Sequence, residues 1–155
     1  MRKHKNFIWL LVAAAVLIGV AILFVNNNDR NNMNLPDADL ITRIEMEQIS
    51  GLGTTSGSVF STRRRDNINA IMSAFSGATR LAGTGANSAM NDTPFQESYL
   101  AIRPYVQGAD GEEVLAARLF LYTEGGEERI FSSYVGIFKI TQDDGNKIRR
   151  IYENR

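Results

Sequence analysis

The sequence contains no cysteine and a single histidine, His4, among its 155 residues. The absence of cysteine excludes disulfides, thiolate metal sites, cysteine nucleophiles and a lipid-modified N-terminal cysteine. His4 lies in the basic N-terminal tip, so a histidine base or histidine metal ligand is excluded from the rest of the chain. We therefore expect a protein that is not an enzyme, with no catalytic residue, no metal site and no cofactor.

The chain also lacks a net charge, because 17 Lys and Arg residues balance 17 Asp and Glu residues. Three of the basic residues (Arg2, Lys3 and Lys5) precede the first apolar run, so the remainder is mildly acidic. Non-specific binding to nucleic acid depends on basic residues that neutralise phosphates. The composition therefore predicts no nucleic-acid partner.

One long apolar run is present, from Phe7 to Val25, without a charged or strongly polar residue. A helix needs about 20 such residues to cross a bilayer, and the basic flank MRKHKN favours a cytoplasmic N-terminus. The sequence therefore predicts a single-pass protein of the cell membrane, held in the lipid bilayer by residues 7–25, with an extracytoplasmic C-terminal domain. A cleaved signal peptide is the alternative, although this run is longer than usual and lacks an Ala-x-Ala site.

The chain divides into four expected parts. Residues 1–6 form the cytoplasmic tip and residues 7–25 the transmembrane helix. Residues 26–37, rich in Asn, are typical of a solvated linker. Residues 38–152 form the extracytoplasmic domain, which is long enough to bury a core without disulfides.

Apolar periodicity predicts the first elements of this domain. Residues 40–49 alternate between apolar and polar side chains, which indicates a half-buried strand. Asp66 is a candidate N-cap for a helix that ends at Gly77. The apolar positions of this helix recur at i, i+3, i+4 and i+7: Ile68, Ile71, Met72 and Phe75.

Three expected strands follow, over residues 99–106, 114–124 and 129–141, separated by turns rich in Gly and Asp. Residues 143–146 (DDGN) indicate another turn, and residues 147–152 a short closing strand or helical turn. The predicted fold class is α+β, with one main helix packed on a small antiparallel sheet in the order β-α-β-β-β, preceded by the single transmembrane helix.

The segment Tyr134-Val135-Gly136-Ile137-Phe138-Lys139-Ile140 resembles a "PY-x-GIY-K-I" signature near the C-terminus of a family of small domains of unknown function. This family belongs to Gram-positive bacteria, and its members typically follow a single membrane anchor or a lipoprotein signal. The sequence has Ser133 and Phe138 where the family pattern has Pro and a second Tyr. The resemblance implies an extracytoplasmic location and supplies no activity.

Two sets of residues are candidates for an interaction surface. Asn91 and Asp92 precede Pro94 by three and two positions, a pattern typical of a fixed turn that can serve as a recognition loop. Gly136 within an expected strand indicates a bulge or the close approach of another backbone. Together with Tyr134 it makes the strand over residues 134–140 the expected docking edge.

A run of three basic residues is a candidate contact for an anionic partner: Arg63, Arg64 and Arg65. Basic side chains at the start of a helix interact unfavourably with the helix dipole, so a binding role would explain why they lie there. The alternative is an ordinary solvated segment before the helix.

The preferred function is a membrane-anchored, non-enzymatic module that binds a protein or another component of the bacterial cell envelope, with an envelope protein as the expected partner. One alternative is a small-ligand sensor or carrier, with the ligand between helix and sheet in a pocket lined by Phe75, Tyr99 and Tyr122. Another alternative, by analogy, is an accessory component of a secretion or conjugation machine.

Overall fold

The computed structural model describes residues 33–155 apart from 51–53, 56, 85–91, 95 and 155. Residues 33–155 form one compact unit. In chain order its elements are η1 (Ala38–Leu40), β1 (Ile41–Ser50), β2 (Thr54–Thr55), β3 (Phe60–Thr62), α2 (Arg65–Ser76), β4 (Thr79–Arg80), β5 (Ser98–Gln107), β6 (Glu113–Leu115), β7 (Leu119–Glu124), β8 (Glu127–Ser132), β9 (Gly136–Ile140) and α3 (Gln142–Glu153).

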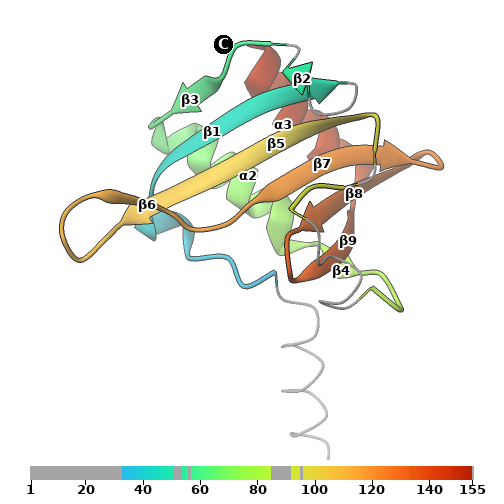
Figure 1. Ribbon diagram of the computed structural model, residues 1–155, viewed down its shortest axis with the longest axis horizontal. Helices are drawn as coiled ribbons and strands as arrows, with labels where there is room; N and C mark the ends of the chain where they lie inside the picture. The colour runs from blue at the N-terminus through green and yellow to red at the C-terminus, as the bar shows by residue number, and fades with distance from the viewer. Residues whose placement is uncertain (1–32, 51–53, 56, 85–91, 95, 155) are drawn as a thin grey trace, which may run out of the picture. The chain divides into compact units, whose positions relative to one another are not determined.

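The strands form one nine-stranded antiparallel sheet within the described residues (Figure 1). Its main path runs β2-β1-β5-β7-β8-β9-β4, and the short strands β3 and β6 pair with β1 and β5. The longest pairing joins β1 to β5, with a register shift between Ile41 and Arg43. Strands β5, β7, β8 and β9 lie side by side in the order in which they occur in the chain. Strand β4 precedes all of them in the chain but pairs with β9 at the edge of the sheet.

Both long helices cover the same face of the sheet (Figure 1). Helix α2 buries the apolar positions predicted from its periodicity, with Ile68 and Ile71 fully inaccessible. From α3, Ile148 enters the same core, which also contains Leu100 and Ile102 of β5. Burial of this apolar surface is the main term that holds the helices on the sheet.

The opposite face of the sheet carries a second, smaller apolar cluster. Because side chains alternate along a strand, Tyr99 and Ala101 of β5 point away from the helices. They pack with Phe120 and Phe131, and the rings of Tyr99 and Phe120 meet edge to face with centroids 5.3 Å apart. The sheet therefore separates two apolar layers, one lined by helices and one rich in aromatic rings.

The predicted fold class was wrong in three respects. The sheet has nine strands rather than the four expected, because the strand expected over 129–141 is divided by a turn into β8 and β9, and because β2, β3, β4 and β6 have only two or three residues each and show no readable alternation. There are two long helices rather than one. No transmembrane helix is present among the described residues.

Helix α3 replaces the turn expected at 143–146 and the short closing element at 147–152. The hydroxyl of Thr141 accepts a hydrogen bond from the backbone N–H of Asp144 at 3.1 Å, which caps the helix. Asp143 and Asp144 then lie in the first turn, where negative charge is favourable. The acidic residues that suggested a turn are therefore the start of a helix.

The N-terminus of α2 also differs from the prediction. Its N-cap is Arg64 rather than Asp66, and no side chain caps it. The end at Gly77 is confirmed, where the helix stops at the expected residue.

No helix in the described part of the chain is long and apolar enough to cross a bilayer. This finding contradicts the predicted single-pass topology and the localisation drawn from it. The run 7–25 on which both depended lies outside the described residues.

Candidate functional site

Two of the predicted interaction residues, 42 positions apart in sequence, are in direct contact. The hydroxyl of Tyr134 donates a hydrogen bond to Oδ1 of Asp92 at 3.0 Å. Ser133 Oγ donates to the backbone carbonyl of Asp92 at 3.2 Å, and a guanidinium nitrogen of Arg118 lies 3.6 Å from the same Oδ1. We call these four residues, Asp92, Arg118, Ser133 and Tyr134, the Tyr134 surface.

The β8–β9 turn presents Tyr134 to solvent. Tyr134 has φ = +62°, a left-handed conformation that is uncommon for a residue with a side chain and most uncommon for a bulky one. The residue is 57% exposed, although a large aromatic ring gains most when buried. Strained backbone of this kind persists when surrounding contacts fix it, and it clusters at functional sites.

The Asp92 carboxylate stabilises the protonated form of the Tyr134 hydroxyl. The hydrogen bond to the carboxylate and its negative charge raise the pKa of Tyr134 above the usual value for tyrosine. The carboxylate therefore favours the protonated hydroxyl that donates to it.

The other predicted surface residues are placed differently. Asn91 lies outside the described residues. Pro94 is buried and presents no surface. Gly136 is buried too, and a Cβ at this position would lie 2.7 Å from the backbone oxygen of Thr84, which confirms the predicted close approach of another backbone.

The predicted docking edge is already paired. Strand β4 lies against β9, with Thr79 opposite Lys139 and Arg80 opposite Phe138. The backbone N–H of Leu81 continues this ladder by donating to the carbonyl of Ile137 at 2.9 Å. The prediction that strand 134–140 offers a docking edge was therefore wrong along β9, whereas Tyr134, in the turn before β9, is exposed.

The three consecutive arginines do not form one patch. Arg65 donates to the backbone carbonyls of Ala38 and Ile41, at 2.9 and 3.2 Å. Arg63 forms a two-pronged contact with Glu113. Arg64 is exposed at the N-cap of α2.

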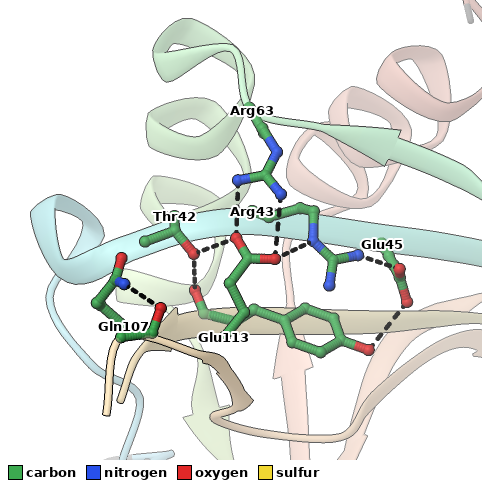
Figure 2. Close-up of polar contacts among 8 residues, drawn as sticks. Thr42, Arg43, Glu45, Arg63, Gln107 and Glu113 are labelled. Carbon is green, nitrogen blue, oxygen red and sulfur yellow. Dashed lines mark hydrogen bonds and ion pairs between the residues drawn. The ribbon is translucent and has the colours of Figure 1, made fainter. Parts of the chain in front are cut away.

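A second polar group, which we call the Glu113 cluster, forms around the carboxylate of Glu113 (Figure 2). Arg43 Nε and Thr42 Oγ1 each donate to it at 2.8 Å. Arg63 donates from both terminal nitrogens, at 2.8 and 3.1 Å. Arg43 also pairs with Glu45, which in turn accepts a hydrogen bond from the Tyr105 hydroxyl at 3.0 Å.

Glu113 itself is poorly suited to acid–base chemistry at neutral pH. Hydrogen bonds from Arg43 and Thr42 lower the pKa of Glu113 to about 2. A general acid or base works best when its pKa is near the operating pH. The carboxylate of Glu113 is therefore a permanently charged acceptor.

Neighbouring carboxylates are also paired with cations. Glu47, largely buried, accepts a hydrogen bond from Arg103 at 2.7 Å on the same sheet face as Glu45. In the part of the chain that the structure describes, no group of three or more His, Cys, Asp and Glu residues is placed to hold a metal ion.

The predicted small-ligand pocket was wrong. Phe75 packs in the core beneath the helices, whereas Tyr99 and Tyr122 belong to the aromatic cluster on the other face of the sheet. The sheet lies between them, so these three side chains cannot line one cavity.

Comparison with protein families gives one match, over residues 29–139, to the family described as "Domain of unknown function (DUF5300)". The chain belongs to this family. The match covers both polar groups described above and ends before α3. It agrees with the predicted resemblance to an uncharacterised family, while the signature over residues 134–140 stays a prediction.

Two further comparisons add little. No match was found among curated proteins. Among solved structures, a thioesterase-like protein from Clostridium sporogenes ATCC 15579 is similar, at 12% identity. The alignment covers 74% of this chain and 96% of that protein, with a TM-score of 0.43, and no conclusion about this chain rests on it.

Several residues of the two polar groups were not predicted from the sequence. Arg118, Thr42 and Arg43 lie in or beside expected strands, where a polar residue usually means a solvated face. Glu113 belongs to an acidic pair beside a turn, which is typical of a soluble loop. What distinguishes these residues is a partner that is distant in sequence, from 26 residues for Arg118 and Asp92 to 71 for Thr42 and Glu113, and only the fold brings such partners together.

Proposed function

We propose that this domain is a non-enzymatic protein-binding module and that the Tyr134 surface is its contact with the partner. The observation that carries the proposal is the exposed ring of Tyr134, which lies in a turn closed by the Val135 N–H to Ser132 carbonyl bond and whose hydroxyl is bonded to Asp92. A ring fixed in this way loses little conformational freedom on binding, which favours affinity.

The composition of the surface supports this role. Tyr and Arg are the residue types most enriched at the centres of protein interfaces. Tyr134 and Arg118 are both more than half exposed, and Asp92 between them is 66% exposed in its side chain. The surface therefore combines an aromatic anchor with charged groups that fix the orientation of a partner.

In-cell crosslinking of the tagged full-length chain, followed by mass spectrometry, tests the proposal. We compare the wild type with Tyr134→Ala, and use Leu40→Ala as a matched control. Leu40 is 60% exposed and lies on η1, outside the Tyr134 surface. Loss of an aromatic hot spot costs about 2 kcal/mol or more, so Tyr134→Ala should reduce capture of the partner at least about tenfold.

Retention of the same partner by Tyr134→Ala and Leu40→Ala would overturn the assignment of the surface. A reproducible, stoichiometric hydrolase activity of the purified chain would overturn the non-enzymatic reading. Circular dichroism of each variant excludes loss of folding as the cause.

A further inference from the structure

The Glu113 cluster has the composition of an anion-binding site whose anion comes from the chain itself. Its four donor atoms belong to β1 and to the connection between β3 and α2. The acceptor is the carboxylate of Glu113 on β6, 50 residues after Arg63 in the sequence. Arg63 engages both carboxylate oxygens, the forked geometry with which arginine recognises carboxylates (Figure 2).

The charge of the cluster balances only while Glu113 is present. The guanidinium groups of Arg43 and Arg63 face the carboxylates of Glu45 and Glu113. Arg43 is 17% exposed in its side chain, so its charge is poorly solvated. Without Glu113 one positive charge stays uncompensated, and another carboxylate at the same place would restore the balance.

The side chain of Glu113 also lies where it can move out of the cluster. Its side chain is 21% exposed, and Arg63 is 65% exposed at the rim of the cluster. Strand β6 is held by its own backbone pairing with β5, from Gln107 opposite Glu113 to Tyr105 opposite Leu115. Rotation of the Glu113 side chain therefore opens the site without unfolding the strand.

We propose that Thr42, Arg43 and Arg63 form a binding site for a carboxylate of a partner peptide, and that Glu113 fills this site as an intramolecular competitor. The site shares no residue with the Tyr134 surface. The two proposals can therefore fail independently.

Glu113→Ala, which empties the site, is the test, with Glu112→Ala as the matched control. Glu112 is the preceding acidic residue, exposed in the turn before β6. Binding is measured by calorimetry at low salt, where screening is weak. The probes are acetyl-tetraglutamate amide, which has only side-chain carboxylates, and acetyl-tetraglutamine, which has only a C-terminal carboxylate; acetyl-tetraglutamine amide and inorganic phosphate are the comparison ligands.

An intramolecular group competes at an effective concentration in the millimolar range or above. Its removal should therefore tighten binding of at least one carboxylate peptide about tenfold relative to wild type. The peptide that binds identifies the source of the carboxylate. Adding Arg63→Ala to Glu113→Ala should abolish the gain.

Equal binding by wild type, Glu113→Ala and Glu112→Ala would overturn the proposal. Binding of phosphate as tight as that of either carboxylate peptide would contradict the proposal that the site is specific for a carboxylate. Glu113→Gln, which keeps the side-chain shape, repeats the test if circular dichroism shows that Glu113→Ala is unfolded, and it must show the same gain.

Discussion

Replacing Arg149 by methionine tests how helix α3 is held against the sheet. The carboxylate of Glu128 on β8 is 1% exposed and accepts a hydrogen bond from Arg149 at 2.8 Å. Thr123 and Gln142 each donate to the same carboxylate at 2.9 Å. Arg149→Met keeps much of the side-chain volume and removes the only cation in this set.

The expected loss of stability is about 2 kcal/mol. A hydrogen bond to a charged group contributes about 1.5–3 kcal/mol, and leaving a buried carboxylate without its cation adds to this. Arg149 is 31% exposed, so water compensates part of the loss and reduces the upper end of the range. With a urea slope of about 2 kcal/mol/M, the unfolding midpoint should fall by about 1 M.

Urea unfolding followed by circular dichroism measures this change. Arg150→Met is the control, because Arg150 is an exposed arginine at the next position of the same helix. Its removal should cost less than about 0.5 kcal/mol, as for most surface substitutions. Equal midpoints for the two variants would show that the bond from Arg149 to Glu128 does not hold the helix.

Two further predictions concern the candidate sites. The pKa of Glu113, lowered to about 2, lies below its ordinary value of 4.5, so this group stabilises the fold above about pH 4.5 and less as the pH falls towards 2. Glu113→Gln should therefore flatten the loss of urea stability between pH 5.5 and 3, whereas an unchanged slope would contradict the assignment. Gly136→Ala places a methyl group 2.7 Å from the Thr84 oxygen at φ = +155° and should cost about 1–3 kcal/mol; a thermal midpoint within error of wild type would show that the backbone yields freely.

Local patterns predicted α2 well because its apolar positions follow one helical period. Ile68, Ile71 and Met72 all face the core as expected. Helix α3 was missed because Gly145 follows two acidic residues, a combination typical of turns. The structure explains why a glycine lies at this position of the helix, since a Cβ there would lie 2.8 Å from Cγ of Glu128.

The two faces of the sheet were harder to predict. Four successive residues of β5, Tyr99 to Ile102, are buried, so the strand shows no alternation that assigns a face. For the same reason Tyr99 was placed with Phe75, although the sheet separates them.

Part of the Tyr134 surface was predicted and part was not. Asp92 and Tyr134 were selected separately, one from turn chemistry and one from its place in a strand. Their contact spans 42 residues of sequence. Arg118, at the end of the connection between β6 and β7, contacts Asp92 as well. The pairing of β7 with β8 brings Arg118, just before β7, close to the turn after β8 that contains Tyr134. Short-range sequence patterns do not reveal this pairing.

The most direct test of the Tyr134 surface is site-specific photocrosslinking in cells of the source organism. A benzophenone amino acid replaces Tyr134 in one variant and Val59 in another, since Val59 is 51% exposed on a different part of the domain. The account predicts a discrete adduct with another protein from position 134, absent from position 59 and lost when Arg118→Ala is added. The same adducts from both positions, or adducts only with further copies of the chain, would contradict it.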